Sequence, residues 1–200
     1  MSLELVPTEK LTVGIKKSFE NAESFLNEVY VLKEYEAWSH AYTFCQFAIE
    51  ELSKIHMLFQ LWIDRINGNE IDYKSLDADF KDHKVKTKLS VEIEMSFFRL
   101  YKEQNGAEWV DDAINKGETF LQNLKHSNDL KNESLYVTVK NNDFQSPSDI
   151  ITKEMFDSIY GTALLRKMLS ETLMRTEEGI NQIAKLLKKE VENGEEDKSS

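Results

Sequence analysis

The chain of 200 residues is long enough for one sizeable hydrophobic core and short for two separate ones. Its net charge of −11 argues against binding to bulk nucleic acid or to an anionic membrane, although it leaves room for a local basic site. A single cysteine excludes an intramolecular disulfide, and seven glycines with two prolines predict long helices joined by short connections.

The first residues and the most apolar segment both predict a cytoplasmic protein without a membrane span. Residues 1–12 lack the basic and then apolar pattern of a secretory signal, and the most apolar helix carries Glu50, Glu51 and Lys54 near its middle. We expect residues 1–7 to be a loose N-terminus, residues 8–190 a single helical domain and residues 191–200 an acidic, disordered tail.

Apolar residues recur at helical spacing in three long segments of the first half of the chain. The first predicted helix spans residues 8–34, and the second spans about residues 37–65 before Asn67-Gly68-Asn69 ends it. A third predicted helix runs from Ser75, its N-cap, to about Glu103.

The second half predicts two more helices. A shorter one covers about residues 109–130, and a long one begins after Thr152 and continues to about Val191. Between them, residues 135–139 have β-type composition without an obvious partner strand, and residues 140–149 form a loop. The sum is an all-α, up-down bundle of four to five helices with a long C-terminal helix.

The second predicted helix carries a carboxylate on its apolar side. When residues 44–63 are projected at about 100° per residue, Glu51 falls among large apolar side chains. Because an unpaired carboxylate is costly to bury, Glu51 is expected to have a partner, with His83 or Lys86 the simplest choice and Lys54 one turn away. The apolar neighbours are Phe47, Ile55, Leu58 and Trp62.

Two short motifs therefore gather the residues that could carry chemistry. Glu50, Glu51 and Lys54 form EExxK, and Asp82, His83 and Lys86 form DHxxK. Glu50 with Lys54, and Asp82 with Lys86, can also be ordinary surface ion pairs at i,i+4. A carboxylate beside an imidazole is what general acid-base chemistry requires. Glycine-rich phosphate loops, HExxH, cysteine clusters and GxSxG are missing, so no metal and no cofactor is expected.

These motifs, with two later segments, resemble the AbiV family of abortive-infection proteins in the HEPN superfamily of helical prokaryotic defence domains. The similarity rests on AIEELSKIHML, FKDHKVK, KNESLYVTV and SPSDIITKE, and it covers about residues 20–170. It implies a HEPN-like bundle and a bacterial antiphage factor that arrests infected cells by acting on translation or RNA after a phage-encoded protein triggers it. It also implies a homodimer, which would account for the length of the last helix.

The resemblance implies roles for particular residues. Its family positions are Glu50, Glu51 and Lys54, His83 and Lys86, and Tyr136 with Val137. In a catalytic interpretation His83 is the general acid or base and Glu51 sets its tautomer and pKa. Lys54, Lys86 and Lys131 then contact phosphate.

One departure from the family leaves the activity open. Many HEPN ribonucleases place a histidine four to six residues after an arginine, and none of the arginines of this chain is followed in this way. Lys131 stands where an arginine is common in the family, and lysine lacks the bidentate fork. The alternatives are a metal-independent ribonuclease, a binder that blocks translation, and a helical protein-interaction adaptor without catalysis.

Overall fold

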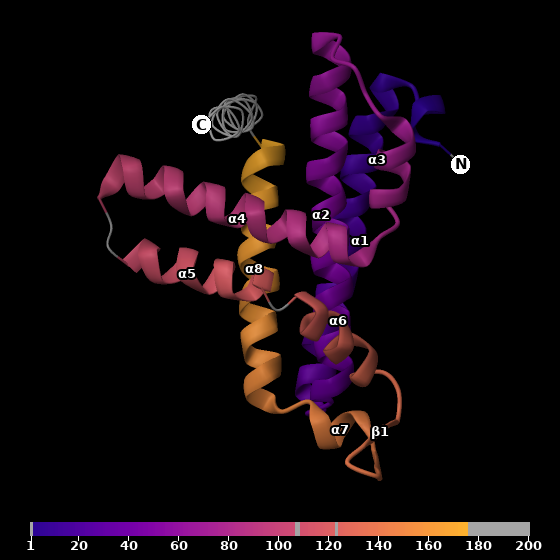
Figure 1. Ribbon diagram of the computed structural model, residues 1–200, viewed down its shortest axis with the longest axis vertical. Helices are drawn as coiled ribbons and strands as arrows, with labels where there is room; N and C mark the ends of the chain where they lie inside the picture. The colour runs from indigo at the N-terminus through magenta and orange to yellow at the C-terminus, as the bar shows by residue number, and fades with distance from the viewer. Residues whose placement is uncertain (1, 107–108, 123, 176–200) are drawn as a thin grey trace.

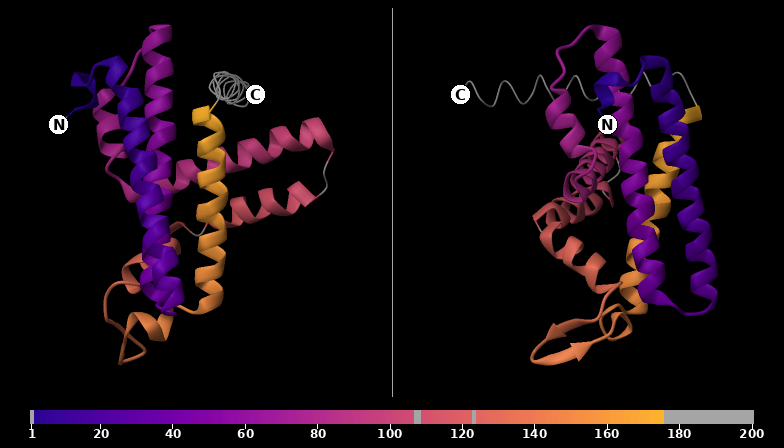
Figure 2. Two further views of the ribbon diagram at one scale, coloured as in Figure 1. Left: turned by 180° about the vertical axis from the view of Figure 1, so that it is seen from behind. Right: turned by 90° about the vertical axis from the view of Figure 1, so that its right-hand side faces the viewer.

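Three long helices lie side by side and form the body of the molecule (Figures 1 and 2). They are α1 (Thr8–Glu34), α2 (Trp38–Asn67) and α8 (Lys153–Arg175), and α2 contacts both of the others. The computed structural model describes residues 2–106, 109–122 and 124–175. Helix α2 is therefore the centre of the body, as its apolar sequence predicts.

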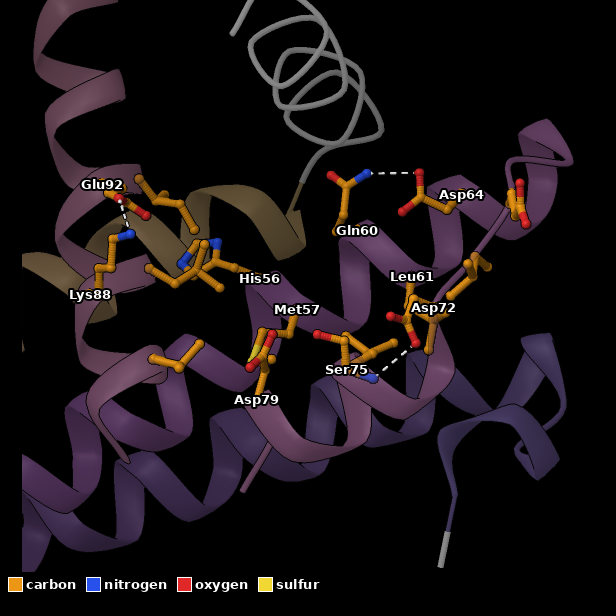
Figure 3. Close-up of a pocket in the computed structure, with 16 residues that line it drawn as sticks. His56, Met57, Gln60, Leu61, Asp64, Asp72, Ser75, Asp79, Lys88 and Glu92 are labelled. Carbon is orange, nitrogen blue, oxygen red and sulfur yellow. Dashed lines mark hydrogen bonds and ion pairs between the residues drawn. The ribbon is translucent and has the colours of Figure 1, made fainter. Parts of the chain in front are cut away.

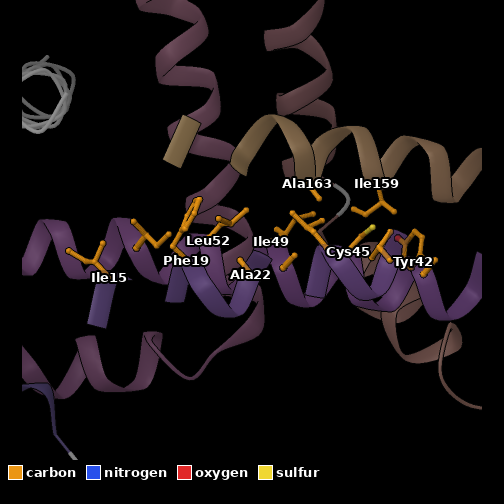
Figure 4. Packing of buried hydrophobic residues seen from close by; sticks show 14 of the residues in the cluster. Ile15, Phe19, Ala22, Tyr42, Cys45, Ile49, Leu52, Ile159 and Ala163 are labelled. Carbon is orange, nitrogen blue, oxygen red and sulfur yellow. The ribbon is translucent and has the colours of Figure 1, made fainter. Parts of the chain in front are cut away.

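The core lies along the seam between these three helices (Figure 4). Helix α1 contributes residues at helical spacing, among them Ile15, Phe19 and Ala22. They pack with Leu52 and other residues of α2, while Ile159 and Ala163 of α8 cover the same seam. Cys45 is fully buried within this core, as expected of a small apolar residue.

The predicted third helix is in fact two helices. Helix α3 (Tyr73–Asp79) ends at a turn, and α4 (His83–Asn105) begins after it. Asp82 caps α4, because its carboxylate accepts from the backbone N–H of Lys84 at 2.7 Å and of Val85 at 3.3 Å. The continuous apolar spacing concealed this break, and the break places His83 in the first turn of α4.

The capping role of Asp82 leads to a testable prediction. Replacing Asp82 by alanine leaves two backbone N–H groups of α4 without an acceptor, and we expect the free energy of unfolding to fall by about 1 kcal/mol. Urea denaturation followed by circular dichroism measures this change. Asp82→Asn is the matched control, since asparagine is also a good cap. An equal loss in both variants would contradict a capping role.

Helices α4 and α5 (Trp109–Gln122) form an antiparallel arm that lies across the three-helix body (Figure 1). Helix α6 (Leu124–Glu133) follows and contacts α4 and α2. One helix was expected over residues 109–130, whereas the structure has two that run in different directions. This change of direction returns the chain to the middle of α2.

A small hairpin follows α6. Strand β1 (Thr138–Lys140) pairs antiparallel with β2 (Asp143–Gln145), with Val139 opposite Phe144. Asn141 and Asn142 form the turn with φ of 53° and 63°, the left-handed conformation of a tight hairpin turn. The expected extended segment therefore has a partner strand, and that strand lies inside the segment predicted as a loop.

Residues 2–7 are attached to the body, although they belong to the segment that was expected to be loose. A short 3-10 turn, η1 (Leu3–Leu5), donates its Leu3 N–H to Asp77 of α3 at 2.8 Å. The guanidinium of Arg65 donates to the carbonyl oxygens of Val6 and Leu3. These hydrogen bonds connect the first residues to α2 and α3.

The remaining elements complete the fold. Helix α7 (Pro147–Ile150) precedes α8, and the Oγ1 of Thr152 caps α8 by accepting from the N–H of Met155 at 3.3 Å. The all-α prediction is confirmed. The expected continuation of the last helix to Val191 and the acidic tail lie outside the described residues. Across the described helices, none combines the length and the apolar character that crossing a membrane needs.

Candidate functional site

Glu50 is the centre of a polar cluster that joins three helices. Its carboxylate contacts the imidazole Nδ1 of His83, accepts a hydrogen bond from the Nζ of Lys131 at 2.7 Å, and lies 3.8 Å from the Nζ of Lys86. The side chain of Glu50 is only 7% exposed. We call Glu50, His83, Lys86 and Lys131 the Glu50 cluster.

Local structure explains why these residues meet. Glu50 lies in the middle of α2, His83 and Lys86 lie in the first turn of α4, and Lys131 lies in the last turn of α6. Ser134, just after α6, holds this end in place: its hydroxyl bonds Thr43 of α2 at 2.6 Å and donates to the Lys131 carbonyl at 2.7 Å. The short α6 thus brings Lys131 to a carboxylate 81 positions earlier in the chain.

Glu51 does not occupy the expected position. It is half-buried and accepts a hydrogen bond from Lys54 at 2.5 Å, three residues later on the same helix. Glu50 makes the contacts with His83 and Lys86 that Glu51 was expected to make. The projection failed because α2 has no single apolar face: α1, α8, α4 and α6 surround it, so Ile49 and Glu50 are buried as well as Leu52.

The two expected surface ion pairs are also different in the structure. Lys54 pairs with Glu51 and not with Glu50, and its ammonium lies 5.6 Å from the centroid of the Phe80 ring. The Asp82 carboxylate caps α4, while Lys86 turns inward and is buried. Both lysines therefore border the site, although each has a partner other than the one the i,i+4 spacing suggested.

The Glu50 cluster contains more lysines than carboxylates. Burial lowers the pKa of Lys86, the nearby carboxylate of Glu50 acts in the opposite direction, and the positive charges of Lys54 and Lys131 lower it further. Lys131 also lies over the ring of Phe47, 5.9 Å from its centroid. One buried carboxylate therefore faces two buried lysines, an arrangement that holds Glu50 strongly in place.

His83 is the member of the cluster that solvent can reach. Its side chain is 55% exposed, whereas the carboxylate that it contacts is buried. With Nδ1 turned to Glu50, Nε2 is the ring nitrogen left for a ligand. A fixed carboxylate behind an exposed imidazole orients the ring, which is how proton-transfer groups are commonly supported.

Tyr136 lies apart from the Glu50 cluster. It follows α6, its side chain is 66% exposed, and within the described residues it has no hydrogen bond to the cluster. Of the residues chosen from the sequence, the structure therefore brings together Glu50, His83, Lys86 and Lys131. Glu51 and Lys54 are neighbours of the cluster.

A second buried polar group was not anticipated. Arg166 of α8 is buried and donates from Nε to Glu94 of α4 at 3.1 Å, and His56 of α2 lies near enough for the charge of Arg166 to lower its pKa. A charged residue inside the apolar stripe of the last predicted helix was the available signal. This arginine and histidine are far apart in the sequence but near each other in the fold, and both are buried. Among the residues with described positions, no group of three or more potential metal ligands was found.

Comparison with known families decides the classification. The profile of the HEPN AbiV family matches residues 10–166, which include all of α2, most of α1, the first part of α8 and all four residues of the Glu50 cluster. The chain belongs to the AbiV family of HEPN domains. The family is one of abortive-infection proteins, and its helical fold agrees with the structure. Searches of curated proteins and of solved structures found no match.

Proposed function

We propose that the protein is an antiphage effector that acts on RNA or the translation machinery of the infected cell, with Glu50 and His83 as its proton-transfer pair. The supporting observation is the contact between the buried Glu50 carboxylate and the exposed imidazole of His83. Glu50 takes the role that the sequence suggested for Glu51: it orients the ring of His83 and fixes its tautomer. His83 then exchanges a proton with the ribose hydroxyl or the leaving oxygen.

Positive charge beside this pair supports a phosphate-containing substrate. Lys54, Lys81 and Lys86 border a pocket of about 430 Å³ between η1, α3 and the start of α4. Lys84 is exposed next to His83. A local group of lysines can contact phosphate even though the whole chain is acidic, because charge within a Debye length dominates at the contact. Lysines supply point charges, which fits contacts that hold a backbone and do not select a base.

The trigger and the assembly complete the proposal. HEPN domains often dimerise, and Leu164 and Met168 are exposed apolar side chains on α8, one turn apart. We expect a homodimer that uses this face, with a phage-encoded protein as the trigger. A protein that stays monomeric at micromolar concentration in sedimentation equilibrium would contradict the dimer.

A non-catalytic effector is the second candidate, and one observation favours it. Lys86 and Lys131 both point to Glu50, so the Glu50 cluster also connects α2, α4 and α6 as a structural unit. Buried ionic groups of this kind can specify how helices pack without any chemistry. In this case the protein would arrest translation by binding alone, or would serve as an adaptor.

Phage plating with His83 variants separates the two candidates. His83→Asn removes the proton-transfer group while it keeps a side chain that can bond Glu50, and we expect the protection against phage to fall by about 100-fold or more. His40→Asn, at another exposed histidine, is the matched control and should protect like the wild type. RNA from infected cells should show new 5′ ends with the wild type and not with His83→Asn.

Two results would overturn the proposal. Full protection by a folded His83→Asn would exclude the proton-transfer role and would favour the binding candidate. A wild-type protein that leaves plating unchanged across a broad panel of phages would contradict the defence function itself. Circular dichroism and thermal unfolding of each purified variant show whether it is folded.

A further inference from the structure

A second pocket also borders α3, and it shares no lining residue with the pocket of Lys54, Lys81 and Lys86. It has a volume of about 450 Å³ and is enclosed by α2, α3, α4 and the connection between α2 and α3 (Figure 3). Figure 3 shows His56 and Gln60 of α2 on one side, and Asp72, the N-cap of α3, with Ser75 of α3 on the other. This volume is sufficient for a small organic molecule.

The lining of this pocket combines an apolar interior with negative charge. Met57, Leu61 and Leu89 are among its apolar residues. Five carboxylates also line the pocket. Its one lysine, Lys88, is paired with one of them, because its Nζ lies 3.4 Å from Oε1 of Glu92. An anion would therefore be repelled, and a cation with an apolar body would match both features.

Two of these carboxylates are available for a ligand. Among the described residues, neither Glu70 nor Asp79 forms a side-chain hydrogen bond or an ion pair. Asp64 and Asp72, by contrast, are already used: Asp64 accepts from Gln60 at 2.9 Å, and Asp72 caps α3 by accepting from Ser75 at 3.0 Å. Glu70 is exposed in the connection before α3, whereas Asp79 is half-buried and is the last residue of α3, so the two carboxylates lie at opposite ends of this helix. Figure 3 shows Asp79 beside Met57, on the side of the pocket where His56 lies.

The buried end of the pocket has polar atoms without partners. His56 is only 9% exposed, and its Nδ1 makes no hydrogen bond; the Oε1 of Gln60 is also buried and without a bond. Burial and the charge of Arg166 lower the pKa of His56 to about 4, so the ring is neutral at physiological pH. Unpaired polar atoms cost free energy when buried, and a ligand that bonds them recovers part of that cost.

We propose that this pocket binds a small amphipathic organic cation, with an ammonium group at Asp79, an apolar chain across Met57 and Leu89, and an uncharged polar group at His56. A hydroxyl suits the buried end because it can donate and accept, and so satisfies either tautomer of the ring. The inference is independent of the proposed function, since it uses neither His83 nor an RNA substrate.

Calorimetric titration with 6-amino-1-hexanol tests the site. We expect saturable binding with one site per chain, weaker binding of hexylamine, which lacks the hydroxyl, and no binding of hexanoate, which has the opposite charge. In the double variant Glu70→Gln with Asp79→Asn, affinity for the amino alcohol should fall by about tenfold. Glu28→Gln with Glu20→Gln, on the exposed face of α1, removes the same net charge elsewhere and should leave affinity unchanged.

A spectroscopic readout makes the test independent of how the variants fold. The imidazole ¹⁵N resonances of His56 in the wild-type protein should shift on addition of 6-amino-1-hexanol, and those of exposed His40 should not. Absence of saturable binding at millimolar concentration would overturn the proposal. Equal affinity for hexanoate, or unchanged affinity in the double variant at the pocket, would also overturn it.

Discussion

Replacing Glu50 by glutamine is expected to lower the free energy of unfolding by about 3–5 kcal/mol, the usual cost of removing one partner from a buried ion pair. The reason is that Lys86 and Lys131 are both buried and both face the Glu50 carboxylate. Glutamine keeps the shape of the side chain but leaves two buried ammonium groups without a counter-charge. Urea denaturation at neutral pH measures the loss.

Glu51 provides the matched control one residue further along the same helix. Glu51→Gln breaks a partly exposed pair with Lys54 and should cost less than about 1 kcal/mol. A compensating change tests the mechanism: Lys86→Met in the Glu50→Gln background should recover part of the lost stability, since an apolar side chain needs no counter-charge. Equal losses of unfolding free energy for Glu50→Gln and Glu51→Gln would show that the Glu50 cluster contributes less to stability than its geometry indicates.

The same pair of glutamates shows where prediction from sequence succeeds and where it fails. The helices of the body and the motifs on α2 and α4 could be placed from periodicity, because long amphipathic segments have a clear repeat. The choice between Glu50 and Glu51 could not, because periodicity finds one buried face and α2 is contacted on several sides. Adjacent residues on such a helix can both be buried, and only the packing decides which partner each one meets.

Contacts between segments that are distant in the sequence were the other feature that prediction from sequence did not provide. Lys131 was singled out by family resemblance, yet its hydrogen bond to Glu50 depends on α6 turning back toward α2. Strand β2 lay hidden in a polar stretch, since a three-residue strand has too few residues to show an alternating pattern. The contact of Arg166 with Glu94 follows from how α8 crosses α4, which no local pattern encodes.

Acid should destabilise the protein through His56, by an amount that a single substitution can isolate. The folded protein holds the pKa of His56 at about 4, below its ordinary value of 6.5, because the ring is buried and lies near the positive charge of Arg166. The unfolded chain therefore binds more protons than the folded protein between these two pH values. The stability contributed by neutral His56 is complete above pH 6.5 and is lost as the pH falls toward 4.

A shift of one pKa unit corresponds to about 1.4 kcal/mol. Through His56 alone, a change from pH 7.5 to pH 4.5 should therefore lower the free energy of unfolding by about 2.5 kcal/mol. The carboxylates that pair in the folded state, Glu94 with Arg166 among them, add their own acid dependence in the wild type and in any variant. His56→Leu removes only the histidine contribution. Its unfolding free energy should therefore fall by about 2.5 kcal/mol less than that of the wild type over the same interval, as measured by urea denaturation at both pH values. Parallel pH curves for the two proteins would mean that His56 titrates alike in the folded and unfolded states, and hence that the ring is hydrated and not buried beside Arg166.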